Sequence, residues 1–165
     1  IRNYKKTLRA ASVMKKKTLK NKFKWTPLHE RLDNIGQPIP PRPVDQRKPK
    51  LWLTIPLKNH DETTTIESYE VYLVNSSGIT LKSVIADSGG WFYDNDELFN
   101  STQTDYIEYK DVEDGDAIKV FTYVPFYDDD EQTWMSLKII MDGNDIEFST
   151  SYNQRTKKLD EEVIL

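Results

Sequence analysis

Apolar and polar residues alternate along several short stretches of the chain after residue 50. The cleanest stretch is 134–141, where Met135, Leu137, Ile139 and Met141 share one side. Successive side chains of a β-strand point to opposite faces of a sheet, so a period of two predicts a strand with one buried face. This period, rather than the period of a helix, constrains the fold of this part of the chain.

The same alternation recurs between turn signals at intervals of about 8–12 residues. It predicts further strands at 51–57, 69–73, 79–85, 91–93, 106–110, 117–126 and 146–148. The predicted turns are a hairpin-like turn at 75–78, a break at Ser88-Gly89-Gly90, a turn at 113–116 and a hairpin at 142–144. About seven short strands with no helix between them predict an all-β fold. We expect an antiparallel β-sandwich, Ig-like or jelly-roll-like, within residues 50–150.

Charge is distributed very unevenly along the sequence. Residues 1–50 hold 15 Lys and Arg residues and three acidic residues, a net charge of +12. Residues 51–165 hold 8 Lys and Arg residues and 24 acidic residues, a net charge of −16. Such asymmetry is typical of a chain whose basic part binds nucleic acid or docks electrostatically on a partner. We therefore interpret residues 1–26 as a basic arm.

The arm has ten basic residues and no acidic residue within positions 1–24. Lysine and arginine neutralise phosphates while aromatic rings stack on bases, so this composition favours salt-sensitive binding of nucleic acid with little sequence selectivity. The candidate partner-binding residues are Arg2, Lys5, Lys6, Arg9, Lys15, Lys16, Lys17, Lys20, Lys22, Lys24 and Trp25. The alternative target is an acidic protein surface, including the acidic domain of a neighbouring copy.

Apolar residues of the arm fall roughly at helical spacing, which predicts that the arm is partly helical when bound. Repulsion between lysines opposes such a helix in the free chain. Six prolines follow between Pro27 and Pro49. Proline lacks the backbone N–H and fixes φ, so residues 27–49 are predicted to form an extended, semi-rigid linker. Residues 151–165 are interpreted as a C-terminal tail.

Residues that could carry catalysis are few or nonspecific. His29 and His60 are the only histidines, and neither stands in a nucleophile or zinc-binding motif. Acidic clusters at 94–97, 113–116 and 128–131 offer paired carboxylates, but a segment this rich in acids produces such pairs by chance. The first and last of these clusters are also candidates for calcium sites, but neither fits an EF-hand loop, and solvated acidic loops are the preferred interpretation. We expect no enzymatic activity, no cofactor and no metal; a carboxylate-dependent hydrolase is a further alternative.

Aromatic residues flank the acidic loops and suggest a second class of function. They are Trp91, Phe92, Tyr93, Phe126, Tyr127 and Trp134. Aromatic rings beside carboxylates can stack on and hydrogen-bond sugars, so a carbohydrate- or ligand-binding β-sandwich module is an alternative. The competing interpretation is that Trp91 and Trp134 belong to the core of the sandwich.

The layout of basic arm, proline-rich linker and acidic β-domain resembles that of basic-armed β-sandwich components of virions and large ribonucleoprotein particles. The resemblance implies a non-enzymatic structural or accessory subunit, anchored by its arm, with the sandwich as a surface or inter-subunit module. Its partners would be other subunits of the assembly, together with nucleic acid or an acidic protein surface. The sequence has no cysteine for disulfides and no stretch of the ~20 apolar residues that a membrane span needs. A virion or cytoplasmic particle is therefore favoured over secretion.

Overall fold

The computed structural model describes residues 16–27, 30–31, 36–37, 48–56, 69–94, 97–100, 105–123, 132–153 and 158–165. These segments form ten β-strands and no α-helix. The strands are β1 (Thr18–Lys20), β2 (Leu51–Thr54), β3 (Tyr69–Asn75), β4 (Leu81–Asp94), β5 (Glu97–Asn100), β6 (Asp105–Val112), β7 (Asp116–Tyr123), β8 (Gln132–Met141), β9 (Asn144–Asn153) and β10 (Lys158–Leu159).

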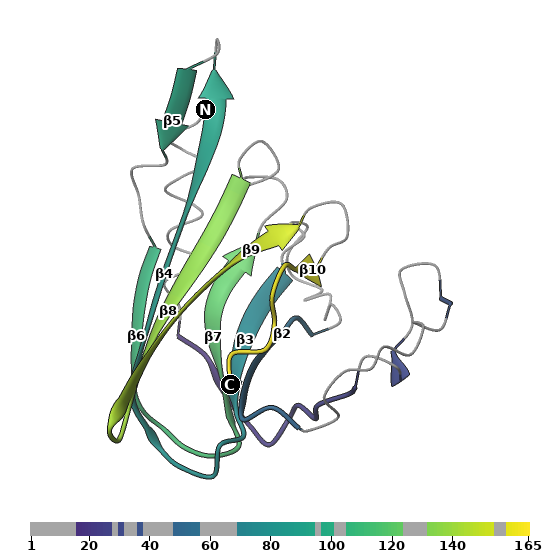
Figure 1. Ribbon diagram of the computed structural model, residues 1–165, viewed down its shortest axis with the longest axis vertical. Coiled ribbons are helices and arrows are strands. Elements are labelled where there is room, and N and C mark those ends of the chain that lie inside the picture. The colour runs from purple at the N-terminus through teal and green to yellow at the C-terminus, as the bar shows by residue number, and fades with distance from the viewer. Residues whose placement is uncertain are drawn as a thin grey trace.

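The strands pair into two antiparallel sheets (Figure 1). The small sheet has the order β1-β7-β3-β2, and the large sheet has the order β10-β9-β8-β4-β5, with β6 also paired to β4. The predicted all-β, antiparallel sandwich architecture is thus confirmed, with ten described strands where about seven were expected. Assignment to an Ig-like or jelly-roll-like topology stays a prediction.

The core lies between the two sheets and is built from the inward-facing positions of the alternating pattern. On β8, Met135, Leu137 and Ile139 are buried and Met141 packs against them, as the sequence predicted. The hairpin predicted at 142–144 is also confirmed, because Met141 of β8 pairs with Asn144 of β9. Tyr123 of the small sheet and Tyr152 of the large sheet stack with their ring centroids 4.2 Å apart, and this contact joins the two layers.

Two turns that look local in the sequence carry the chain from one sheet to the other. The turn after β3 was expected to close a hairpin, but β3 belongs to the small sheet and β4 to the large one. The turn at 113–116 crosses back from β6 to β7. Asn75 joins the two crossings: its buried side-chain amide donates to the carbonyls of Ile79 at 2.8 Å and Val112 at 3.0 Å. The prediction of a hairpin at 75–78 was wrong because this tertiary contact, not the turn residues, sets the path.

The predicted break at Ser88-Gly89-Gly90 is also wrong, because β4 continues through it to Asp94. Gly89 faces Trp134 in the pairing of β4 with β8. A Cβ atom at Gly89 would lie 2.8 Å from the indole ring of Trp134, so the glycine makes room for that ring inside a continuous strand. In Figure 1 the end of β4 reaches, together with β5, beyond the other strands.

The last described residues close one side of the sandwich. β10 pairs with β9 at the edge of the large sheet. The following residues lie along β2, where the Leu53 N–H donates to the Glu162 carbonyl at 2.7 Å and the Leu51 N–H donates to the Leu165 carbonyl at 3.1 Å. The segment interpreted as a C-terminal tail therefore supplies strand β10 and backbone partners for the edge of the small sheet.

Candidate functional site

The second half of the basic arm, residues 16–25, lies on the small sheet, and we call it the docked arm segment. It begins with β1, which pairs antiparallel with β7 so that Thr18 faces Ile118 and Lys20 faces Asp116. Over the described residues of the arm the chain is therefore strand and extended backbone, and a helix in the bound arm stays a prediction. Residues 1–15, the rest of the predicted arm, lie outside the described part of the chain.

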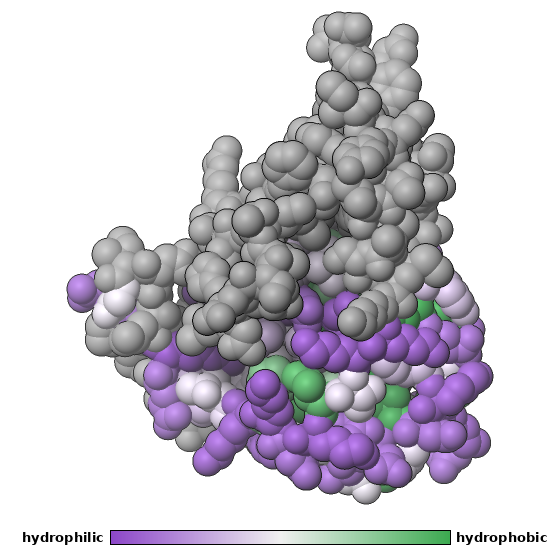
Figure 2. Space-filling model, turned by 180° about the vertical axis from the view of Figure 1, so that it is seen from behind, coloured by the Kyte–Doolittle hydropathy of each residue, from purple (hydrophilic) through white to green (hydrophobic). Residues whose placement is uncertain are grey.

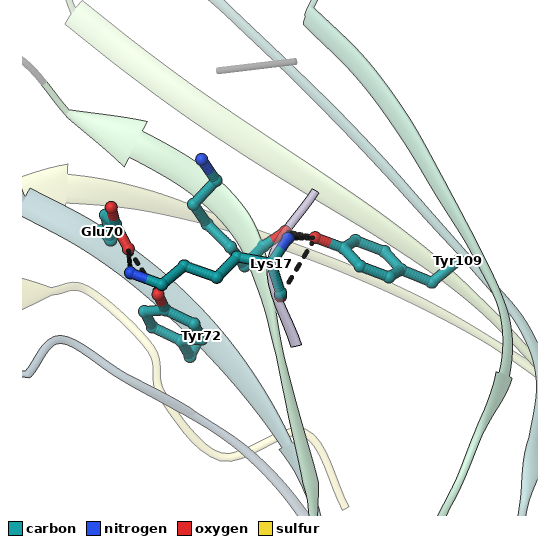
Figure 3. A network of polar contacts seen from close by, with 5 residues as sticks. Lys17, Glu70, Tyr72 and Tyr109 are labelled. Atoms are coloured by element: carbon teal, nitrogen blue, oxygen red, sulfur yellow. Dashed lines mark hydrogen bonds and ion pairs between the residues drawn. The ribbon is translucent and has the colours of Figure 1, made fainter. Parts of the chain in front are cut away.

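A ring of three hydrogen bonds fixes the start of the docked arm segment (Figure 3). The Lys17 N–H donates to the hydroxyl of Tyr109 at 3.0 Å, and that hydroxyl donates to the Lys119 carbonyl at 2.7 Å. The Lys119 N–H in turn donates to the Lys17 carbonyl at 2.9 Å. Tyr109 lies on β6 of the large sheet, so one phenol connects that sheet to β7 and to the arm. Burial raises the pKa of Tyr109, which keeps this donor protonated at neutral pH.

The side chain of Lys17 points away from Tyr109 toward a carboxylate on the small sheet. Its Nζ lies 3.5 Å from Glu70 Oε2, and the hydroxyl of Tyr72 donates a hydrogen bond to the same oxygen. Burial, reinforced by the hydrogen bond to Glu70, raises the pKa of Tyr72. Figure 3 shows Lys17 between Tyr109 on one side and Glu70 with Tyr72 on the other.

At the other end of β1, Lys20 binds the acidic turn that joins β6 to β7. Its Nζ lies 3.2 Å from Glu113 Oε2 and 3.2 Å from Asp116 Oδ1, and these hydrogen bonds raise the pKa of Lys20. The chain then turns at Asn21, which has a φ of 49° and whose N–H donates to the carbonyl of Gly115 at 2.9 Å. Asparagine is one of the few residues that adopt this left-handed conformation at small cost.

After this turn the arm crosses the outer face of the small sheet toward β2. Phe23 packs on Tyr72 of β3 with ring centroids 5.5 Å apart, and Trp25 meets Trp52 of β2 edge-on at 5.2 Å. The covered residues Trp52, Tyr72, Val74 and Ala117 form a second apolar cluster, separate from the core between the sheets. The guanidinium of Arg31 lies 4.7 Å from the centre of the Trp25 ring and pairs with Glu162. The arm thus crosses the small sheet from β7 to the C-terminal segment.

The docked arm segment has an apolar side and a basic side. Leu19, Phe23 and Trp25 are partly buried against the sheet, whereas Lys22 and Lys24 are exposed. Neither of these two lysines makes a hydrogen bond or an ion pair within the described part of the chain. This period of two was present in the sequence, but the four-residue interval between Leu19 and Phe23 also fits a helix, which is why sequence reasoning missed the strand.

The predicted partner-binding residues fall into three groups. Arg2, Lys5, Lys6, Arg9 and Lys15 lie outside the described residues. Lys16, Lys17 and Lys20 contact the sandwich itself, with Lys16 Nζ 5.6 Å from the centre of the Tyr109 ring. Lys22 and Lys24 are free to contact another molecule. Trp25, expected to stack on a base, packs instead against Trp52.

The acidic turn at 113–116, weighed as a source of catalytic carboxylates, makes contacts that hold the fold. Asp114 Oδ1 accepts the N–H of Gly78 at 2.9 Å, and Asp116 Oδ2 accepts the N–H of Glu113 at 3.0 Å. Among the described residues no three histidine or acidic side chains are grouped so as to hold a metal ion. The histidines and the cluster at 128–131 lie outside the described residues, and the side chains of Asp94 and Glu97 are not among those described.

On the face that Figure 2 shows, the described residues are mostly hydrophilic, with small hydrophobic groups between them. Among the described residues only Ile79, Tyr106, Val163 and Leu165 are large hydrophobic side chains that are exposed. No described helix has the length and apolar character to cross a membrane. Comparisons with family models, curated proteins and solved structures found no match for this chain.

Proposed function

We propose that this chain is a non-enzymatic structural or accessory subunit of a large assembly, a virion or a ribonucleoprotein-like particle. In this proposal residues 1–15 reach out to a polyanion, either nucleic acid or an acidic protein surface, and the sandwich contacts neighbouring subunits. The observation that carries it is the attachment of residues 16–25 to the sandwich, which gives the basic residues before them a fixed point of origin.

Electrostatics favours this arrangement over a freely solvated tail. The sequence before Lys16 has five basic residues and no acidic one, and Lys22 and Lys24 extend the positive charge onto the outside of the docked arm segment. The contacts of Lys17 and Lys20 already occupy nearby carboxylates, so they lower the attraction of the remaining arm to its own acidic domain. The remaining cations are thus available for a partner.

Anisotropy titration of the full chain with a fluorescent single-stranded oligonucleotide, repeated over a series of salt concentrations, tests the proposal. Log K falls as log salt rises, and each phosphate contact that is lost makes this negative slope shallower by about 0.7 for a single strand. We expect the triple variant Lys5→Gln, Lys6→Gln and Arg9→Gln to make the slope shallower by about 2. A polyglutamate peptide in place of the oligonucleotide tests the acidic-protein target.

The matched control is Lys138→Gln with Lys158→Gln, because both lysines are exposed on the large sheet. This pair should leave the slope unchanged. Equal effects of the arm variant and the control, or no binding to either polyanion, would contradict the proposed role of the arm.

A carbohydrate-binding module remains a second candidate because of one contact on the outer face of the large sheet. The indole ring of Trp134 lies against Gly89, and Tyr106 of β6 is 53% exposed on the same face. Two rings on a polar sheet face are a platform of the kind that sugars stack on. Glycan binding that Trp134→Ala abolishes and that deletion of residues 1–15 leaves intact would support this candidate over the first.

A further inference from the structure

The contacts of the docked arm segment do not require that arm and sandwich belong to the same chain. They consist of the β1–β7 pairing, two aromatic contacts and ion pairs with acidic residues of the sandwich. A second copy of the chain presents the same surface with the same residues. Whether the arm docks on its own sandwich or on a neighbour therefore depends on the connection between them.

That connection is long and its two ends lie close together. Arg31 pairs with Glu162, whose carbonyl accepts the N–H of Leu53 on β2. The 19 residues 32–50, between Arg31 and the start of β2 at Leu51, contain five prolines. Self-docking therefore requires this stretch to begin and end at nearly the same place.

Proline-rich sequence favours extension over such a return. At about 3.1 Å per residue in the polyproline conformation, 19 residues span roughly 60 Å. A domain of this size is about 35 Å across, from a radius of gyration of roughly 13 Å. The connection therefore has the reach to place the arm on an adjacent copy, and its prolines oppose the closed loop that self-docking needs.

We propose that the arms are exchanged between copies: residues 16–31 of one chain dock on the outer face of the small sheet of a second copy. The inference rests on the proposed assembly role and names one partner within it. Because the contacts are the same in both arrangements, exchange is decided by concentration. Dilute protein keeps its own arm, and the crowding of copies within a particle favours transfer. Exchange of this kind joins subunits into closed pairs or open chains.

Cross-linking with engineered cysteines tests the exchange, and the chain has no native cysteine to interfere. Lys20 and Asp116 face each other across β1 and β7. One preparation carries only Lys20→Cys and the other only Asp116→Cys, so a disulfide between positions 20 and 116 requires two chains. The two are mixed, oxidised at about 10 µM and at about 1 mM, and analysed by non-reducing gels and peptide mass spectrometry.

We expect a 20–116 disulfide between chains whose yield rises at least about tenfold over this concentration range. Lys22→Cys mixed with Asp116→Cys is the control, because residue 22 has left the register of β1. The double variant Lys20→Cys/Asp116→Cys reports docking within one chain in dilute solution. An intrachain disulfide in the double variant without any interchain product in the mixture would overturn the exchange, as would the absence of both. No polyanion is present, so this result is independent of nucleic-acid binding.

Discussion

The outer faces of the two sheets differ in what they carry. Along β9 of the large sheet the outward Asp145, Glu147 and Ser149 are exposed, as is usual for an antiparallel sheet with one face in water. On the small sheet all eight residues of β7 are buried. The docked arm segment contributes to this difference, because it covers Trp52, Tyr72, Val74 and Ala117 on the outer face of the small sheet.

This contrast divides the predicted arm into a part that belongs to the fold and a part whose role is a proposal. Residues 16–25 contribute a strand and two aromatic rings to the domain, so they belong to the fold. Residues 1–15 remain as the part of the arm proposed to bind a partner. The small sheet includes a strand of the arm and the large sheet does not. Changes near the arm should therefore cost more stability than similar changes on the large sheet.

Truncation should produce the largest effect. Deletion of residues 1–26 exposes Trp52 and Tyr72 of the small sheet and removes β1. Full burial of one large apolar side chain contributes about 1.5–3 kcal/mol. Phe23 and Trp25 are partly buried, so removing both rings together with β1 should cost on the order of 3–5 kcal/mol. That is a large fraction of the stability of a typical domain.

Urea unfolding followed by circular dichroism measures this loss. Deletion of residues 1–15 is the control, and its free energy of unfolding should stay close to that of the full chain. Equal unfolding midpoints for the two truncations would show that the docked arm segment adds nothing to the fold.

Single substitutions should show the same difference between the two sheets, with a smaller loss of stability than the truncation. Phe23→Ala removes the ring that packs on Tyr72, and because Phe23 is only partly buried we expect a loss of about 1–2 kcal/mol. Glu147→Ala on the exposed face of β9 should change stability by less than about 0.5 kcal/mol. Urea unfolding of both variants checks the comparison, which fails if their losses are alike.

Two glycines with positive φ lie in different turns, one next to the docked arm segment and one in the hairpin of the large sheet, and their alanine variants can be compared. Gly115 has a φ of 89° and Gly143 of the β8–β9 hairpin has a φ of 78°, so alanine is strained at both. A Cβ atom at Gly115 would lie 2.3 Å from Asn21 Oδ1, whereas nothing lies within 4 Å at Gly143. Because the side chain of Asn21 has to move away, Gly115→Ala should cost about 0.5–1 kcal/mol more than Gly143→Ala.

Thermal unfolding of Gly115→Ala in the chain with and without Asn21→Gly separates the contact from the strain. The excess cost should disappear in the double variant. An excess that persists would place its origin in the turn alone, and the arm would not be involved.

The sequence predicted those parts of the fold that depend on local pattern. Alternation on β8 gave the correct buried residues, and Asp142-Gly143 gave the correct hairpin. The failures all depend on distant partners. The path after Asn75 follows from its bonds to Val112 on another strand, and the continuity of β4 at Gly89 follows from Trp134 on β8.

The candidate site was predicted in composition but not in form. The partner-binding role of the basic residues stays a prediction, and the acidic residues that contact Lys17 and Lys20 are far away in the sequence, on the small sheet and its acidic turn. Lysine-rich composition predicted an arm that binds a separate partner, because no pattern within the arm reveals that Leu19, Phe23 and Trp25 meet an apolar face formed by β2, β3 and β7.

High pH should produce the smallest effect, and two of the groups that contribute to it lie at the docked arm segment. The pKa of Tyr72 is raised by burial and by its bond to Glu70, and that of Lys20 is raised by its bonds to Glu113 and Asp116. Both groups hold their protons more tightly when the arm is docked, so their contribution to stability is complete below their ordinary pKa values of 10.0 and 10.5 and declines as the pH rises above them.

Tyr72→Phe removes the hydrogen bond to Glu70, so it should lower stability at about pH 8, but it should flatten the decline above about pH 10. Thermal unfolding of the two proteins across this range measures both changes. Parallel curves would show that Tyr72 titrates normally and that its hydroxyl is not held under the arm.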